Sequence, residues 1–454
     1  MSNYTFNYHI YPKSGFLNDP NGLAQFKGKY HVFYQWLEEV TPQGAKCWGH
    51  YVSTDLVHWK DQGIALHPDS WYDKNGVYSG SAIVHEDTLY LFYTGNVRNS
   101  RGERESYQCL ATSEDGENFK KHGPVIEVPK GYTAHFRDPK VWKDKENNYW
   151  WMVIGAQTQE LKGNVVLYGS YNLEDWEYKG NILPEQMNWG YMCECPDLIE
   201  LQGNNYLLVS KQEKIKINEE EIDQSIAVYL PGEFSQEIPS YAPLSDGIRL
   251  DEGFDYYAPQ TFLDDKGRRL LIAWMGGGEI DYQLSQPTVN EGWLHGLTIP
   301  RELVVFDKTL YQKPVDELAL LRANKKDFMI NNEEKHLNFT SKSIELLVEN
   351  RDCSNLKIKL FHTVIFTYDS VSKSITIKRQ NWLTNQYDSN SFYIETDLET
   401  CRIFIDCSSV EIFINHGEKV LTMRAYFEEE NNKVYFGSNK SLKISSWDLV
   451  KEES

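Results

Sequence analysis

Short apolar runs separated by polar turn residues extend along the chain. The runs are rich in Val, Ile, Leu and aromatic residues, and Gly, Asn or Asp bounds them, which is typical of strands joined by turns. Five such runs recur at regular spacing in the first two thirds of the chain: HVFYQW, LFYTG, WWMVIG, YLLVS and LLIAW. The pattern predicts an all-β fold.

Two repeats with a period near 60 residues order these runs. The first is a Ser-x-Asp or Ser-x-Asn pattern that ends on an aromatic residue, at residues 53–59, 113–119 and 170–176. The second begins at five leading residues, spaced by 59, 60, 56 and 63 positions: Asp19, Tyr78, Asp138, Glu194 and Tyr257. Each of the five strand-like runs has its middle residue 15 positions after one of these leading residues. A fixed period of this length predicts five propeller blades. A chance alignment within a general all-β chain is the alternative, and the constant offset argues against it.

The repeat stops after residue 303, and a different pattern follows. Residues 304–324 are predicted to connect two domains and to contain a short helical segment. From residue 325 to residue 454, alternating strands such as LKIKLF, SITIKR and VEIFIN follow one another without helices, which predicts a β-sandwich. We therefore expect a five-bladed β-propeller at 1–303 and a C-terminal β-sandwich at 325–454.

Length and charge narrow the class of protein. A chain of 454 residues is too long for one compact core, which stops growing near ~250–300 residues. The net charge of −20 disfavours nucleic acid and anionic membranes as partners. The first nine residues contain no export signal, and no apolar run approaches the ~20 residues of a membrane span. We expect a cytoplasmic protein whose seven cysteines are reduced thiols.

Three of the five leading residues are acids: Asp19, Asp138 and Glu194. The first strand of each propeller blade lines the central channel, so these carboxyl groups are predicted to converge. Like charges at close range repel, so one acid should hold its proton. A protonated acid beside an ionised carboxylate is the arrangement that glycoside hydrolysis requires. A purely structural role is the alternative interpretation of these acids. Asp-Pro is a common turn former, and Arg137 could merely neutralise the charge of the neighbouring aspartate.

The segments around these acids resemble the signature motifs of glycoside hydrolase family 32, the invertases, fructanases and sucrose-6-phosphate hydrolases. They are Asn18-Asp19-Pro20-Asn21-Gly22, Arg137-Asp138-Pro139 and Glu194-Cys195-Pro196. The resemblance implies a retaining β-fructofuranosidase with Asp19 as nucleophile, Glu194 as acid/base and Asp138 as stabiliser, acting on a sugar without metal or cofactor. It also implies a sugar pocket formed by Asn18, Gln35, Trp48, Ser79, Arg137, Tyr257 and Trp274.

The substrate is expected to be sucrose 6-phosphate or sucrose, with fructo-oligosaccharides as an alternative. Basic residues in loops near the first two blades are candidates for binding a phosphate, or are simply solubilising: Lys46, Arg98, Arg101 and Arg104. Residues 41–45 lack a Trp that many family members have, which puts the leaving-group site in doubt. Fructosyl transfer, a non-catalytic carbohydrate-binding propeller and an inverting pentose-releasing hydrolase are the rival functions. The oligomeric state is not predicted.

Three further features are assigned no catalytic role. Cys193 and Cys195 flank Glu194, but no second ligand cluster supports a metal site. His50 lies in strand-like sequence and is interpreted as a structural residue. Residues 276–278 are three glycines without a following helix or Lys, so they predict a flexible rim loop and not a phosphate-binding loop.

Overall fold

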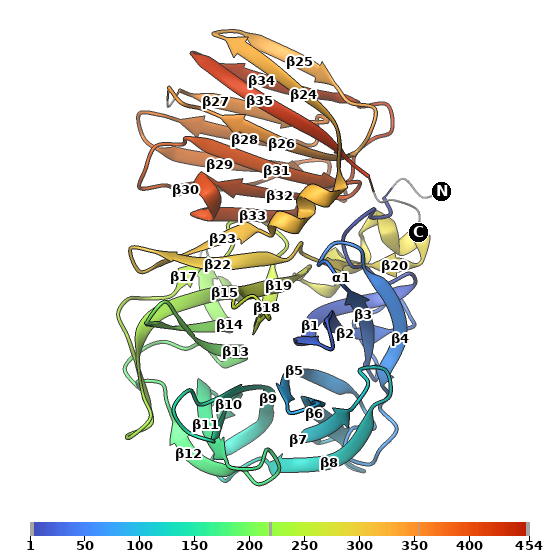
Figure 1. The fold of residues 1–454 in the computed structure, drawn as a ribbon, viewed down its shortest axis with the longest axis vertical. Helices are drawn as coiled ribbons and strands as arrows, with labels where there is room; N and C mark the ends of the chain where they lie inside the picture. The colour runs from blue at the N-terminus through green and yellow to red at the C-terminus, as the bar shows by residue number, and fades with distance from the viewer. Residues whose placement is uncertain (1–3, 218–219, 353, 451–454) are drawn as a thin grey trace.

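The computed structural model describes residues 4–217, 220–352 and 354–450 (Figure 1). These residues form seven β-sheets, one short α-helix and three 3₁₀ segments. Five sheets are arranged around a common axis as propeller blades, and two six-stranded sheets pack against each other at one end of the molecule (Figure 1). The predicted fold class, a five-bladed β-propeller followed by a β-sandwich, is confirmed.

Each blade is an antiparallel sheet whose first strand lies nearest the axis. The first blade contains β1 (Gly15–Phe26), β2 (Lys29–Leu37), β3 (Cys47–Ser53) and β4 (Lys60–Leu66). The second contains β5 (Val77–His85), β6 (Thr88–Arg98), β7 (Arg104–Ser113) and β8 (Lys120–Glu127). The third contains β9 (Tyr132–Lys143), β10 (Trp150–Thr158), β11 (Gly163–Ser170) and β12 (Glu177–Asn181). The fourth blade contains β13 (Met192–Leu201), β14 (Asn204–Ile217), β15 (Glu220–Ser235), β16 (Ser240–Pro243) and β17 (Ile248–Arg249). The fifth contains β18 (Tyr257–Leu263), β19 (Arg269–Met275), β21 (Gly296–Leu297), β22 (Arg301–Phe306) and β23 (Thr309–Pro314).

Backbone hydrogen bonds close the ring between the last blade and the first. The inner strands β1, β5, β9, β13 and β18 contact one another in order, and β18 contacts β1. The short strand β20 (Trp293–Leu294) pairs with β1, while β21, two residues further on, pairs with β19 of the fifth blade. The segment before β20 contains the helix α1 (Ile280–Leu284) and the 3₁₀ segment η1 (Pro287–Glu291). One short stretch of chain therefore joins both ends of the ring.

The Ser-x-Asp repeat forms the turn between the third and fourth strands of the first three blades. In the first, Asp55 Oδ1 accepts hydrogen bonds from Ser53 Oγ (2.9 Å) and from the backbone N–H groups of residues 57 and 58. Asp115 and Asn172 make the same bonds in the next two blades. A short polar side chain that captures the backbone ahead of it is an Asx turn, which explains why the pattern recurs.

The propeller extends beyond residue 303, where the sequence predicted its end. β22 and β23 form a hairpin within the fifth sheet, so the blade ends at Pro314. The turn places Asp307 and Lys308 at φ angles of 46° and 63°, which matches a two-residue turn with both central residues left-handed. The true connector is the 3₁₀ segment η2 (Asp316–Leu321), which lies within the predicted 304–324.

The β-sandwich encloses its own apolar core. Its two sheets contain β24 (Arg322–Asn331), β26 (Ser343–Glu349), β31 (Thr400–Asp406), β32 (Ser409–Ile414), β33 (Lys419–Arg424) and β35 (Ser441–Leu449); and β25 (Glu334–Asn338), β27 (Leu356–Leu360), β28 (Val364–Asp369), β29 (Ser374–Gln380), β30 (Tyr387–Tyr393) and β34 (Lys433–Ser438), with η3 (Asn415–Gly417) between β32 and β33. In β27, Leu356, Ile358 and Leu360 are buried and the two lysines between them face outward, because successive side chains of a strand point to opposite faces.

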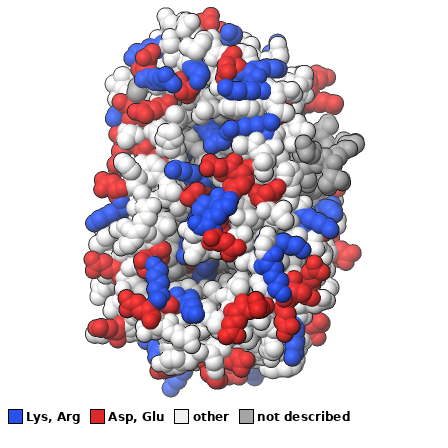
Figure 2. Space-filling model, in the orientation of Figure 1, with Lys and Arg blue, Asp and Glu red and all other residues white. Residues whose placement is uncertain are grey.

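The two domains share a buried interface that contains charged groups. Arg301 of β22 is fully buried and donates to Glu411 Oε2 of the sandwich at 2.6 Å. Glu411 also contacts His9 of the N-terminal segment. On the surface, acidic and basic side chains are interspersed over the face seen in Figure 2. In the part of the chain that is described, no helix is long and apolar enough to cross a membrane.

Candidate active site

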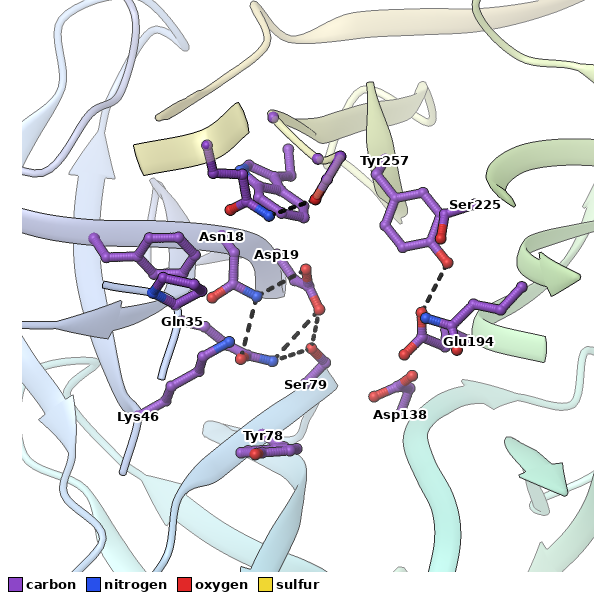
Figure 3. A pocket seen from close by; sticks show the side chains of 18 of the residues that line it. Asn18, Asp19, Gln35, Lys46, Tyr78, Ser79, Asp138, Glu194, Ser225 and Tyr257 are labelled. Atoms are coloured by element: carbon purple, nitrogen blue, oxygen red, sulfur yellow. Dashed lines mark hydrogen bonds between the residues drawn. The ribbon is translucent and has the colours of Figure 1, made fainter. Parts of the chain in front are cut away.

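A cavity of about 390 Å³ lies between the inner strands of the blades (Figure 3). All five blades contribute to its lining. The five leading residues of the sequence repeat all lie in its wall: Asp19, Tyr78, Asp138, Glu194 and Tyr257. The leading residues of the repeat therefore converge on one cavity, as the sequence predicted.

A break in each inner strand turns these side chains into the cavity. In β5, β13 and β18 the pairing with the next strand shifts directly after Tyr78, Glu194 and Tyr257. Asp138, Cys195 and Ala258 have φ angles of 68°, 46° and 48°, and each precedes a proline. Proline has no N–H to donate to the ladder, so the strand bulges there.

The three acids do not occupy equivalent positions, which corrects the sequence interpretation. Arg137, Glu194 and Tyr257 are the last residues to pair before the bulge, opposite Gly155, Ser210 and Trp274 respectively. Asp138 follows this position and matches Cys195, not Glu194. Asp19 lies one position further on again, because Leu17 is the last residue of β1 to pair before the bulge and pairing resumes at Pro20. The three acids therefore occupy three successive positions relative to the bulge: Glu194 directly before it, and Asp138 and Asp19 within it.

Neighbouring polar groups fix the Asp19 carboxylate. Oδ1 accepts a hydrogen bond from Asn18 Nδ2 at 2.9 Å, and Oδ2 accepts from Ser79 Oγ at 2.6 Å. Gln35 Nε2 lies 3.4 Å from Oδ2 and also donates to Ser79 Oγ. Burial raises the pKa of Asp19, while Lys46 and the Ser79 hydrogen bond oppose the rise. The carboxylate is held in one orientation, as an attacking nucleophile requires.

Asp138 is buried beside the chain that carries Glu194. Its Oδ2 accepts from the backbone N–H of Cys195 at 2.9 Å and lies 3.9 Å from Arg137 Nε. Burial raises the pKa of Asp138, Arg137 opposes the rise, and Glu194 adds to it. Cys195 Sγ lies 3.9 Å from Asp19 Oδ2 and 3.7 Å from Asp138 Oδ2. Burial and these aspartates raise the pKa of the Cys195 thiol, so a neutral group separates the two carboxyl groups.

Glu194 faces Asp19 across the cavity (Figure 3). Its Oε1 accepts from Arg137 Nη2 at 2.6 Å and from Arg137 Nε at 3.2 Å. Its Oε2 accepts from the Tyr257 hydroxyl at 2.7 Å. Both carboxyl oxygens have a directional partner, so the side chain cannot rotate away from the cavity without losing them.

Comparison with known families decides the class of enzyme. The model for the N-terminal domain of family 32 glycosyl hydrolases matches residues 9–314, and the model for the C-terminal domain matches residues 317–450. The chain belongs to glycoside hydrolase family 32. The boundary between the two matches coincides with the end of β23 in the structure.

Relatives along the full length agree with this assignment to family 32. The chain is 42% identical to a sucrose-6-phosphate hydrolase of Bacillus subtilis (strain 168), over 98% of this chain and 94% of the relative. The solved sucrose-6-phosphate hydrolase of Lactobacillus gasseri superposes with a TM-score of 0.89 at 30% identity, over 99% of this chain and 94% of the other. A family 32 β-fructofuranosidase of Bombyx mori, BmSUC1, gives a TM-score of 0.86 at 30% identity, with the same coverage.

Most residues that the sequence assigned to the family 32 sugar pocket lie in the cavity wall. These are Asn18, Gln35, Ser79, Arg137, Tyr257 and Trp274. Trp48 does not: it is fully buried, 5.7 Å from the ring of Phe33, and its Nε1 donates to the Tyr78 carbonyl at 3.1 Å. Successive side chains of β3 point to opposite faces of the sheet, and that of Trp48 points into the core between the first two blades. Trp48 therefore packs on the side of Tyr78 that faces away from the cavity.

The four phosphate-binding candidates divide into two pairs. Lys46 and Arg104 line the cavity and lie against the ring of Tyr78, at 5.9 and 6.0 Å from its centroid. Arg98 and Arg101 do not line it. Arg98 Nη1 donates to the Gly102 carbonyl, and Arg101 pairs with Glu103 at 2.8 Å in an exposed turn.

Several residues that line the cavity were not predicted from the sequence. They are Phe16, Gln212, Ser225, Phe254 and Gln283. Gln212 and Ser225 face each other across the hairpin of β14 and β15, which carries no motif. Residues 276–278, predicted as a rim loop, also lie in the wall. Among the described residues, no group of three His, Cys, Asp or Glu side chains is arranged to hold a metal ion.

Proposed function

We propose that the enzyme is a retaining β-fructofuranosidase that hydrolyses the fructosyl bond of sucrose 6-phosphate. The proposal rests mainly on the placement of Asp19 and Glu194 on opposite walls of one cavity. Asp138, from the neighbouring third blade, lies beside Glu194 in the same wall. Retaining glycosidases use a nucleophile and an acid/base about 5 Å apart.

In the first step, Asp19 attacks the anomeric carbon of the fructosyl unit. The glycosidic C–O bond breaks, and the proton of Glu194 moves to the departing oxygen. A covalent fructosyl-enzyme results. In the second step, Glu194 takes a proton from water, whose oxygen attacks the same carbon and releases Asp19. Asp138 holds fructose hydroxyl groups, and these bonds strengthen as positive charge develops on the ring.

Two buried polar atoms in the wall are available for sugar hydroxyl groups. Asn18 Oδ1 and Trp274 Nε1 have no hydrogen-bond partner among the residues that the structure describes. A buried polar group without a partner is costly, and a bound sugar would supply the missing bonds. Both residues lie in the same cavity as the three acids.

Lys46 and Arg104 support a phosphorylated substrate. Both lie within about 6 Å of the Tyr78 ring centroid in the cavity wall, although the protein carries a net charge of −20. Two cations beside one aromatic ring form a suitable site for a phosphate group. The names of the relatives from Bacillus subtilis and Lactobacillus gasseri point to the same substrate.

Comparing sucrose 6-phosphate with sucrose tests this proposal. We expect kcat/KM to be at least about tenfold higher for the phosphorylated sugar, because a charge-assisted bond contributes roughly 1.5–3 kcal/mol. Replacing Arg104 by Gln should remove this preference and leave sucrose hydrolysis within about twofold. Arg98→Gln, a change in the exposed turn, is the matched control and should retain the preference. Equal kcat/KM for both sugars in the unmodified enzyme would contradict the phosphate site.

The stereochemical course is tested separately. An NMR spectrum taken early in the reaction should show release of β-fructose. Release of the α-anomer would contradict Asp19 as nucleophile. The cytoplasmic location expected from the sequence stays a prediction.

A further inference from the structure

One wall of the cavity is formed by two segments that also contact the β-sandwich. The first, residues 254–257, precedes and begins β18 and contributes Phe254, Tyr256 and Tyr257 to the wall. The second, residues 276–283, contributes the three glycines and Gln283 of α1. Neither segment carries one of the three acids. The first nevertheless positions the Tyr257 hydroxyl that binds Glu194.

Arg379 of the sandwich strand β29 binds both segments at once. Its Nη1 donates to Asp255 Oδ2, in the first segment. Its Nη2 donates to the Tyr282 hydroxyl of α1 at 2.8 Å and to Asp388 Oδ2 within its own domain at 2.6 Å. Its guanidinium carbon lies 4.7 Å from the ring centroid of Phe254, a wall residue. Arg379 is 1% exposed, so water does not compete for these bonds.

Further contacts connect α1 to the sandwich and to the cavity loop. Tyr282 donates to Asp255 Oδ1 at 3.1 Å, which links the two wall segments directly. Trp382 Nε1 of the sandwich donates to Ser285 Oγ at 3.0 Å, and its ring lies 5.0 Å from that of Tyr282. Gln283 Nε2 donates to the Gly278 carbonyl at 2.7 Å. A displacement of α1 would therefore move the loop that lines the cavity.

We infer that Arg379 is a positioning residue through which the β-sandwich sets the geometry of the active site. Its planar fork holds Asp255 and Tyr282 in fixed directions, which a lysine ammonium cannot do. Asp255 is two residues from Tyr257, so its release shifts the Tyr257 hydroxyl relative to Glu194. The sandwich thus acts on catalysis by a defined chain of contacts and not only by covering apolar surface.

A double-mutant cycle between Arg379→Lys and Tyr257→Phe tests this inference. We expect each variant to lower kcat/KM by roughly tenfold to hundredfold, since small misplacements of catalytic groups have effects of this size. If Arg379 acts through Tyr257, the double variant should be no more than about threefold worse than Tyr257→Phe alone. Circular dichroism and thermal denaturation confirm that each variant is folded at the assay temperature.

Arg402→Lys is the matched control. Arg402 lies in the same domain, its Nε donates to Glu345 Oε1 at 2.7 Å within the sandwich, and none of its contacts among the described residues reaches the cavity wall or Asp255. This variant should lose thermal stability while kcat and KM change less than about twofold. A folded Arg379→Lys enzyme with unchanged kcat and KM would overturn the inference, and so would losses that multiply independently in the cycle.

If Arg379→Lys does not fold, Trp382→Phe provides the second test, since it removes the bond to Ser285 and keeps an aromatic ring beside Tyr282 and Arg379. We expect it to raise KM several-fold by loosening α1. An unchanged KM in this variant would count against the inference. The assay rests on the proposed function for its substrate, and the two can fail separately: inactivity of the unmodified enzyme would contradict the proposed function alone.

Discussion

His9 provides a pH-dependent test of how the two domains are joined. Its Nδ1 lies 2.8 Å from Asp406 Oδ2 and its Nε2 lies 2.9 Å from Glu411 Oε1, and all three side chains are buried. Burial lowers the pKa of His9, but the two carboxylates outweigh it and raise the pKa from 6.5 to about 9. The charged imidazolium is therefore a stable part of the interface.

The magnitude follows from linkage between protonation and folding. Between pH 6.5 and pH 9 the folded state binds more protons than the unfolded state, so stability falls as the pH rises. The rise of the His9 pKa from 6.5 to about 9, at 1.36 kcal/mol for each pH unit, corresponds to about 3 kcal/mol of stability. This contribution is present in full below pH 6.5 and is lost by about pH 9. His9→Gln cannot carry the charge, so its free energy of unfolding should lack this slope.

Urea denaturation at intervals from pH 6 to pH 10 measures the effect. The difference in stability between the unmodified enzyme and His9→Gln should be largest at pH 6 and should shrink by roughly 3 kcal/mol toward pH 10. His336→Gln, a change at an exposed histidine of the β-sandwich, is the control and should follow the unmodified enzyme at every pH. Parallel curves for His9→Gln and the unmodified enzyme would refute the reasoning.

Three further predictions concern the cavity and the blades. Glu194→Ala should lower kcat by about 10² to 10⁴ without unfolding the protein; steady-state kinetics measures this, and a variant with most of its rate would exclude the acid/base role. Asp138→Asn should lower kcat by about 10² to 10³. It should also become more stable relative to the unmodified enzyme as the pH rises above 3.8, because the raised pKa of Asp138 makes its ionisation unfavourable in the folded state. Denaturation at pH 5 and pH 8 tests this, and an equal difference at both values would contradict it. Gly80→Ala should destabilise the second blade by several kcal/mol, because its Cβ would lie 1.9 Å from the Phe92 carbonyl oxygen; an unchanged melting temperature would show that the strands can separate there.

The sequence by itself was sufficient for the architecture and for the convergence of three acids on one cavity. The five blades could be counted because strand runs and Asx turns are local signals, each set by a few adjacent residues such as Ser53 and Asp55. The convergence of Asp19, Asp138 and Glu194 followed from the repeat, since a closed ring brings every inner strand to one axis.

Tertiary structure decided the finer arrangement. Glu194 pairs directly before the bulge of its strand, whereas Asp138 lies within the bulge, and one residue of register is invisible in a repeat whose spacing varies from 56 to 63. The burial of Trp48 depends on the packing of two neighbouring blades. The contact of Arg379 with Asp255 joins residues 124 positions apart in different domains. Such contacts arise only when separately folded sheets pack together, so no pattern within either segment could have predicted them.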